Sequence, residues 1–294
     1  MQNIKFIKDY KAKDKLRSSF NELANHVFGI SFEEWYQKGF WNERYIPYSY
    51  VLAEKVIANV SVNLLDFMVN GEKKSAIQIG TVMTHPDFRH QGLSGKLMRK
   101  VLEEYENKCD FIYLFANDTV LDYYPKFGFE VIEETQFFYD NLPSASNPTT
   151  LKILDGHDEM DLQFIYEFAK NRVPVSLTFG STNSHSILMF YCLSVFQNNL
   201  YYLEEDNVIL IFAEEDETLH IYELIAKEKC SVEKILHKIV PLGIKKIILH
   251  FTPDSENLLN VKKHPCKNGE TLFVKSKGEL SFPDAFKHPL LSQA

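Results

Sequence analysis

A glycine-containing turn between an apolar strand and an amphipathic helix constrains the fold more than any other feature of the sequence. The turn covers residues 89–95 and contains Gly92 and Gly95. Apolar side chains then recur on one helical face, at Leu93, Leu97, Val101, Leu102 and Tyr105. A helix N-terminus presents unpaired N–H groups and partial positive charge, and glycine lets an anion approach the backbone closely. The segment therefore predicts a phosphate or pyrophosphate site, with an ordinary strand-to-helix turn as the alternative.

Two widespread phosphate-binding motifs do not fit this turn. A P-loop needs G-x-x-x-x-G-K-S/T, whereas two residues separate Gly92 from Gly95, and Leu97 follows Lys96. A Rossmann fingerprint needs three glycines after a first parallel strand, whereas an antiparallel meander is expected before the turn. The sequence therefore indicates neither a P-loop protein nor a dinucleotide-binding enzyme.

The composition argues against several classes of function. A net charge of −8 disfavours partners that need a basic face, namely nucleic acid and an anionic membrane surface. The four cysteines, Cys109, Cys192, Cys230 and Cys266, are scattered and form no C-x-x-C pair. We therefore expect reduced thiols, a cytoplasmic protein and no bound metal. No apolar run approaches membrane length, and the N-terminus lacks the pattern of a signal peptide.

The chain is expected to divide at a segment rich in proline, serine and asparagine. This segment, residues 141–150, is predicted to be a linker between a domain at residues 1–140 and a second domain at residues 151–294. The expected order in the first part is β-α-α-β-β-β-turn-α-β-α-β, with a short helix at Val120–Lys126 and a last strand at Phe129–Tyr139. The second part shows a similar order. The pattern predicts an α/β protein with a structural repeat, each part a mixed, mostly antiparallel sheet flanked by helices.

A second motif follows the helix and the next strand. The segment Asn117–Glu130 carries Tyr124 four residues before Gly128 and Phe129. Together with the glycine turn it resembles the GNAT superfamily of N-acetyltransferases, whose motifs read R-x-x-G-x-G/A and N-x-x-A-x-x-x-Y-x-x-x-G-F. In the first motif Arg89 and Gly92 match, and Ser94 stands where the family prefers Gly or Ala. In the second, Val120 stands at the alanine position.

The first half also looks like the catalytic half of enhanced-intracellular-survival-type acetyltransferases, in which a second GNAT-like domain follows the first. This resemblance implies acetyl-CoA as the acetyl donor. The implied cofactor-binding residues are Val82, Met83, Thr84, Arg89, His90, Gln91, Gly92, Leu93, Ser94, Gly95 and Asn117. A strand core is the simpler interpretation of Val82 and Met83, and an N-cap is the alternative for Asn117.

The resemblance also implies direct transfer of acetyl to the primary amine of a small molecule or peptide. Tyr124 would be the general acid that protonates the leaving thiolate, and Tyr123 is the alternative. The general base stays open among Glu33, Glu34, Asp66, His85 and a water chain. Aromatic residues in the segment 31–49, among them Trp35 and Trp41, suggest either an acceptor pocket or the packing of two helices. The rival function is a non-catalytic acyl-CoA-binding or interaction protein.

The second half lacks both motifs. No glycine stands between its third strand and the helix at Val232, and no Tyr-x-x-x-Gly-Phe follows. We therefore expect a degenerate GNAT-like domain that binds no cofactor. It would serve as a scaffold, a lid or a dimer surface, which leaves room for a homo-oligomer.

Overall fold

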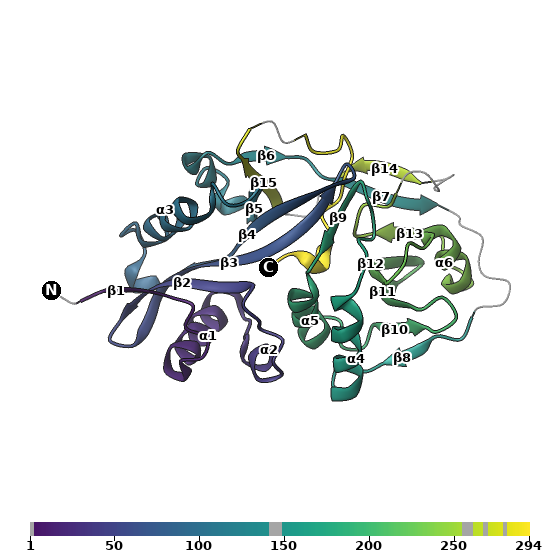
Figure 1. The fold of residues 1–294 in the computed structure, drawn as a ribbon, viewed down its shortest axis with the longest axis horizontal. Coiled ribbons are helices and arrows are strands. Elements are labelled where there is room, and N and C mark those ends of the chain that lie inside the picture. The colour runs from purple at the N-terminus through teal and green to yellow at the C-terminus, as the bar shows by residue number, and fades with distance from the viewer. Residues whose placement is uncertain (1–2, 141–148, 255–260, 267–269, 279–280) are drawn as a thin grey trace.

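A long β-hairpin, β3 (Lys55–Val69) and β4 (Glu72–Thr84), forms the centre of the first sheet (Figure 1). The computed structural model describes residues 3–140, 149–254, 261–266, 270–278 and 281–294. The hairpin turns at Asn70 and Gly71, whose φ angles of 51° and 81° suit the Asn-Gly turn of a tight hairpin. In spatial order the other strands are β1 (Lys5–Lys8) and β2 (Tyr45–Leu52) on one side and β5 (Phe111–Asn117), β15 (Glu270–Ser276) and β6 (Glu130–Ile132) on the other, with β9 (Phe179–Thr182) pairing with β3.

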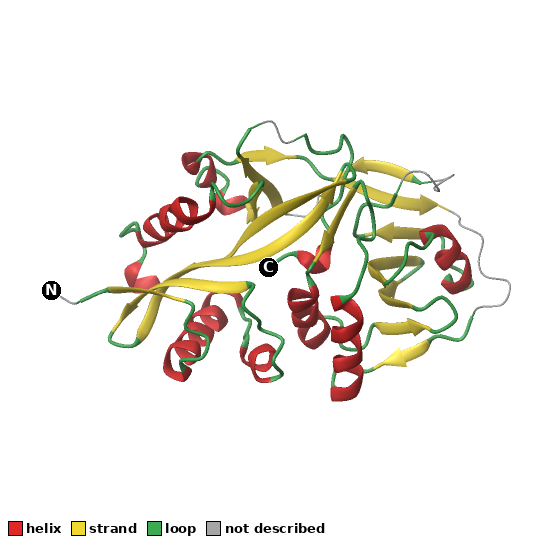
Figure 2. Ribbon diagram, in the orientation of Figure 1, coloured by secondary structure: helices red, strands yellow, loops and turns green. Residues whose placement is uncertain are grey.

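Helices cover both faces of this sheet (Figure 2). On one face lie α1 (Asp14–Phe28) and α2 (Glu33–Gln37), and on the other lies α3 (Leu93–Tyr105). Side chains alternate along a strand, so neighbouring residues enter different cores. Val56 packs in the cluster of α1 and α2, whereas Ile57 packs in the cluster of α3.

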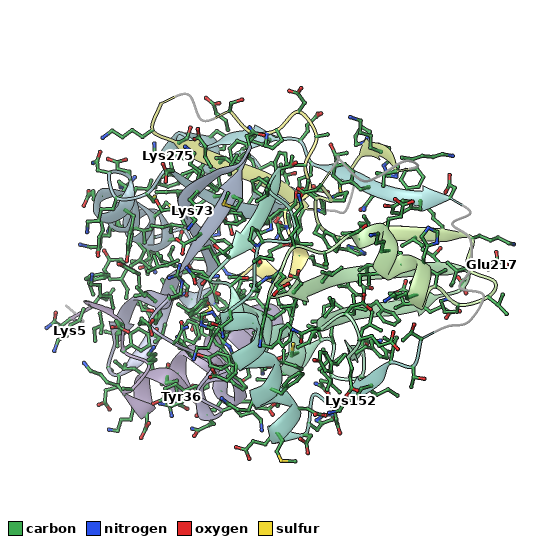
Figure 3. All side chains as sticks on the ribbon, turned by 45° about the vertical axis from the view of Figure 1, so that its right-hand side comes forward. Lys5, Tyr36, Lys73, Lys152, Glu217 and Lys275 are labelled. Atoms are coloured by element: carbon green, nitrogen blue, oxygen red, sulfur yellow. The ribbon has the colours of Figure 1, made fainter. Side chains whose placement is uncertain are left out.

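The second sheet has seven strands and its own helices. In spatial order the strands are β14 (Lys262–Pro265), β7 (Thr135–Asp140), β13 (Lys246–Leu249), β12 (Thr218–Ala226), β11 (Val208–Glu215), β10 (Leu200–Leu203) and β8 (Lys152–Leu154). The helices α4 (Glu159–Lys170) and α5 (His185–Ser194) pack on one face, and α6 (Val232–Ile239) packs on the other. In Figure 3, Lys5 of β1 and Glu217 of the β11–β12 turn mark opposite ends of the molecule, and side chains fill the space between the ribbons.

The two sheets exchange strands. β7 precedes the predicted linker but lies in the second sheet, whereas β15 comes late in the chain and pairs with β5 and β6 of the first. The division at residues 141–150 therefore stays a prediction, and residues 141–148 lie outside the described part of the chain.

Two predicted elements were wrong. The single strand at Phe129–Tyr139 is broken into β6 and β7 at Glu134, whose carboxylate turns inward and pairs with Lys287 at 2.9 Å. The helix at Val120–Lys126 is replaced by two 3-10 turns, η2 (Asp118–Val120) and η3 (Tyr124–Phe127). Pro125 has no N–H to donate to a longer helix at this point.

Candidate active site

The candidate site begins where two parallel strands separate. β4 and β5 are paired only from Ala76 to Gln78 and from Phe111 to Tyr113. Beyond this point β4 carries one extra residue relative to β3, because Asn59 faces Met83 while Ser61 faces Gly80. Thr81, inside this bulge, has a φ of +46°. A bulge bends its strand and increases its twist, and β4 accordingly diverges from β5.

Buried polar side chains hold the bulge in place. The Asn59 side-chain amide donates to the carbonyl of Thr81 and to the hydroxyl of Ser61, each at 2.9 Å. The hydroxyls of Tyr45 and Thr81 lie 2.5 Å apart, and Ser49 donates to Asn59 at 2.8 Å. A bulge leaves backbone groups without ladder partners, and a buried unpaired carbonyl is costly. These contacts satisfy that carbonyl and stabilise the divergence.

A cavity of about 530 Å³ lies at the divergence. Side chains of the first half line one part of it, namely Ile79, Val82 and Thr84 of β4, Ser94 of α3, and Phe115 and Asn117 of β5. Residues from the second half of the chain line another part, namely Ile187, Phe190, Tyr191, Glu270, Gln293 and Ala294. The site is therefore built by both halves of the molecule. Figure 1 shows the end of the described chain at the middle of the structure, beside β3.

The glycine turn ends in an uncapped helix N-terminus. Gly92 is the residue before α3 and has a φ of +70°, a left-handed conformation that favours glycine. In the described part of the chain no side chain caps this end of α3, and an added Cβ at Gly92 would meet no atom within 4 Å. Within the described ranges, the first N–H groups of α3 thus have no side-chain cap, as an anion site at a helix N-terminus requires.

The predicted cofactor residues fall into three groups. Four of these residues line the cavity, namely Val82, Thr84, Ser94 and Asn117. Three are buried in the protein core, and these are Met83, Leu93 and Gly95. The other residues of the turn are Arg89, His90, Gln91 and Gly92, of which the first three are exposed or half-buried at the surface. The guanidinium of Arg89 donates to the carbonyl of Thr84 at 3.4 Å, which holds it close to the end of β4.

Asn117 caps the turn that follows it, as the alternative interpretation predicted, and it also lines the cavity. Its side-chain oxygen accepts from the backbone N–H of Thr119 at 3.0 Å, so it caps the 3-10 turn η2. The same residue lines the cavity at the end of β5.

Both candidate tyrosines line the cavity, but their surroundings differ. Tyr124 is 5% exposed and packs against Phe129 and Phe273. Burial raises the pKa of Tyr124 to about 12, with a smaller contribution from Tyr123. Its hydroxyl is therefore protonated at neutral pH. The hydroxyl of Tyr123 instead donates to Ser94 at 3.1 Å and ties η3 to the first turn of α3.

Two of the four side chains considered for the general base are held in ion pairs. Glu33 pairs with Arg17 at 2.9 Å, and this hydrogen bond lowers the pKa of the glutamate. Asp66 pairs with Arg44 at 3.1 Å. The lining of the cavity includes none of the four candidates, Glu33, Glu34, Asp66 and His85. The geometry therefore selects no base among them.

The aromatic residues of segment 31–49 form a packed core. Trp35 and Trp41 are 1% and 3% exposed, and their indole N–H groups donate to the carbonyls of Ser186 and Tyr45, each at 2.8 Å. Of this group Phe32 reaches the cavity. The interpretation as helix packing is therefore correct for the tryptophans, and it extends to α5 of the second half.

Several cavity residues carried no signal in the sequence. Ala294 hydrogen-bonds through its backbone N–H to the Gln78 side chain at 2.8 Å. A Cβ on Gly80 would lie 2.7 Å from the Ala294 oxygen, so the close approach of these two segments needs glycine there. Pairing between residues this far apart in the chain leaves no local pattern.

Neither a metal-binding cluster nor a membrane-spanning helix is found among the described residues. Within the described ranges, no group of three or more His, Cys, Asp or Glu side chains is arranged to hold a metal ion. Among the described helices, none is long and apolar enough to cross a membrane.

Known proteins resemble both the first half and the whole fold. Residues 10–132 match the family model described as an acetyltransferase (GNAT) domain. N-alpha-acetyltransferase 50 of Danio rerio is 30% identical over 81 residues, which are 26% of this chain and 48% of that protein. The chain thus spans about half the length of this curated relative.

Solved structures extend the likeness over almost the whole chain. A probable N-acyltransferase from Enterococcus faecalis V583 has a TM-score of 0.60 at 15% identity, over 94% of this chain and 73% of that chain. Eis1 from Mycobacterium abscessus has a TM-score of 0.58 at 11% identity, over 92% and 73%. A GCN5-related N-acetyltransferase from Kribbella flavida has a TM-score of 0.58 at 14% identity, over 94% and 71%. Residues 10–132 are therefore a GNAT acetyltransferase domain, within a chain that has the two-sheet fold of these proteins.

Proposed function

We propose that this protein is an acetyl-CoA-dependent N-acetyltransferase that moves an acetyl group directly to a primary amine. The observation that carries the proposal is one cavity lined by the diverging strands β4 and β5, by Ser94 in the first turn of uncapped α3, and by Tyr124. The family match supports acyl transfer, and acyl-CoA is the donor that GNAT acetyltransferases use.

The residues present fit this donor. The backbone amides of Gly92–Gly95 would bind the pyrophosphate, because the N-terminus of α3 has no side-chain cap among the described residues and carries the positive end of the helix dipole. The hydroxyl of Ser94 and the guanidinium of Arg89 would add donors. The β4 backbone at Val82–Thr84 has no pairing with β5, so its free groups would pair with the amides of the pantetheine arm.

The chemistry needs few protein groups. When bound, acetyl-CoA supplies an activated acetyl thioester. Transfer forms an N–C bond as the C–S bond breaks, and the amine loses one proton while the thiolate gains one. The Tyr124 hydroxyl would donate the proton to the thiolate, because its raised pKa of about 12 keeps it protonated at neutral pH and it is 5% exposed.

The test compares Tyr124→Phe with Tyr123→Phe. Acid–base assistance contributes roughly a hundred- to ten-thousand-fold in rate, so Tyr124→Phe is expected to lower kcat within that range without changing acetyl-CoA affinity. Tyr123→Phe removes the hydrogen bond to Ser94 and should leave kcat nearly unchanged. Thiol release from acetyl-CoA across a panel of amines measures both.

Full turnover by Tyr124→Phe, or loss of activity in Tyr123→Phe alone, would show that the general acid is assigned wrongly. Tight binding of acetyl-CoA without transfer to any amine would instead favour a non-catalytic acyl-CoA-binding protein. Calorimetric titration with CoA separates these two outcomes, because it reports binding independently of turnover.

A further inference from the structure

One wall of the cavity lies away from the strands and helix end assigned to acetyl-CoA. It is formed by apolar and aromatic side chains from the end of α1, the α1–α2 connection and α5, namely Phe28, Ile30, Phe32, Ile187, Phe190 and Tyr191. Phe32 and Phe190 stack with ring centroids 5.1 Å apart, so the two halves of the molecule meet in this wall. Such a wall favours an apolar body of aromatic size, since binding removes its surface from water.

Most polar groups at this wall already have partners. The Tyr191 hydroxyl donates to the backbone carbonyl of Gln293 at 2.8 Å. The Gln293 side-chain amide donates to one carboxylate oxygen of Glu270 at 2.5 Å. A ligand rich in hydroxyl groups would lose its hydrogen bonds to water and find few donors and acceptors at this wall. Each group left unpaired costs free energy.

Glu270 is the exception. Among the described residues it is the one acidic side chain that lines the cavity, and Gln293 occupies only one of its carboxylate oxygens. It stands opposite Asn117 in the β15–β5 pairing, at the end of β5 where the cavity lies. Its charge also reaches the apolar wall, since burial first and the nearby Glu270 second raise the pKa of Tyr191 above its ordinary value. A carboxylate with a free oxygen beside an apolar wall matches a single cationic group on an apolar body.

We infer that the acceptor is a monoamine on an apolar, aryl-sized body, bound against the wall that contains Phe32 and Phe190, with its ammonium against Glu270. This inference rests on the proposed function and names the substrate class of the same site. It excludes polyhydroxylated aminosugars as preferred acceptors, because their hydroxyls would stay unpaired at this wall, and polyamines, because a second ammonium would lie against apolar side chains. Before attack the ammonium releases one proton to water, and the second proton is balanced by protonation of the thiolate. Glu270 acts in recognition, so its loss should weaken acceptor binding more than turnover.

The experiment measures kcat and KM by thiol release at saturating acetyl-CoA with three acceptors. These are 2-phenylethylamine, glucosamine and putrescine. We expect kcat/KM for 2-phenylethylamine to exceed that for each polar amine by about a hundredfold, which is the factor by which an apolar pocket discriminates against an added hydroxyl group. Glu270→Gln keeps the shape and removes the charge, and hydrogen bonds to charged groups contribute roughly 10- to 150-fold in affinity. We expect a loss of that size for 2-phenylethylamine, mainly in KM.

The matched control is Glu130→Gln, an exposed glutamate of β6 that does not line the cavity. It makes the same change of charge and should keep KM within about twofold, in line with surface substitutions elsewhere. CoA affinity, measured by calorimetry, should be unchanged in both variants and confirms that both are folded.

The possible failures are distinguishable. CoA binding without thiol release for any amine overturns the proposed function. Faster acetylation of glucosamine or putrescine than of 2-phenylethylamine leaves that function standing and overturns the inference. So does a Glu270→Gln variant whose KM matches that of Glu130→Gln.

Discussion

The two halves of the molecule separate their strands in the same way but fill the space differently. In the first half, the extra residue of β4 accompanies its divergence from β5, and a cavity of about 530 Å³ lies there. In the second, β12 also carries an extra residue, because Ile211 faces Glu223 while Phe212 faces Ile221. The paired stretch of β12 and β13 then ends at Ile221 and Leu249. The two halves therefore share the bulge and differ in what lies beyond the paired strands.

In the second half the chain's own residues occupy the region beyond the paired strands. The ring of Tyr222, the extra residue of β12, lies 4.5 Å from that of His250. Leu290 donates from its backbone to the carbonyl of His250 at 3.1 Å, and Leu291 is fully buried. The 3-10 turn η5 (Leu290–Ser292) packs against both β12 and α5. A segment that lies in the second half thus continues directly into the cavity of the first.

The helices that follow the two bulged strands, α3 after β4 and α6 after β12, differ at their N-termini. The N-terminus of α3 is preceded by Gly92 and has no side-chain cap among the described residues. The N-terminus of α6 is capped by the hydroxyl of Ser231, which accepts from Lys234 N–H at 3.3 Å. A capped terminus has fewer free donors for an anion. We propose on this ground that the second half is a degenerate repeat with a structural role.

The largest expected difference is in ligand stoichiometry. Because α3 has an uncapped N-terminus beside the cavity whereas its counterpart α6 is capped by Ser231, we predict one CoA site per chain and none in the second half. Calorimetric titration of the full chain with CoA measures the number. Two equivalent sites per chain would break the comparison.

The second prediction removes the site in the first half. Gly92→Val places a β-branched residue at a φ of +70° and a side chain in the space proposed for phosphate. We expect CoA affinity to fall below detection. Gly39→Val is the control, since Gly39 has a φ of +78° and an added Cβ there also meets nothing within 4 Å. Both variants should lose similar stability, and only the first should lose CoA binding.

The third prediction concerns the segment that fills the second half. Leu291 is fully buried, and truncation of such a leucine leaves a cavity. We expect Leu291→Ala to lower the free energy of unfolding by about 2–5 kcal/mol. Leu242→Ala, at a position that is 84% exposed, should change it by less than about 0.5 kcal/mol. Equal effects in a urea titration would contradict a packing role for the segment.

The smallest predicted effect is a pH dependence of stability. His288 is buried without a partner for either ring nitrogen among the described residues, beside Tyr113 and the ion pair of Lys287 with Glu134. Burial, and then Lys287, lower its pKa to about 3. The unfolded chain therefore binds a proton at His288 below about pH 6.5 while the folded chain does not. This contribution to stability is present above pH 6.5 and is lost as the pH falls toward 3.

His288→Phe keeps an aromatic ring and removes the titrating group. We expect the loss of unfolding free energy between pH 6.5 and 4 to become smaller in the variant, although His250 still contributes because its pKa is also lowered to about 3. Urea titrations across this range measure the slope. An unchanged slope would show that His288 does not titrate with folding.

Local features were predictable where one residue type decides the backbone. The Asn70-Gly71 hairpin and the glycine turn before α3 are present, since both need positive φ at their glycines. The position of Tyr124 in the cavity agrees with its motif, whose role stays a proposal. The prediction of a helix at Val120–Lys126 was wrong because it rested on helical periodicity alone. Pro125 has no N–H to donate, so it interrupts the hydrogen bonds of a longer helix.

The sequence by itself determined the strand and the helix on either side of the glycine turn, the positive φ at Gly92 before α3, and the net negative charge. These depend on backbone freedom, periodicity and net charge, which act over a few residues or over the whole chain. Only the tertiary structure decided that β15 inserts beside β5 and that Glu270, Phe190 and Ala294 reach the cavity. It also decided that the bulge of β12 packs against the chain's own residues. Such pairings depend on register and packing between segments far apart in sequence, so no local pattern encodes them.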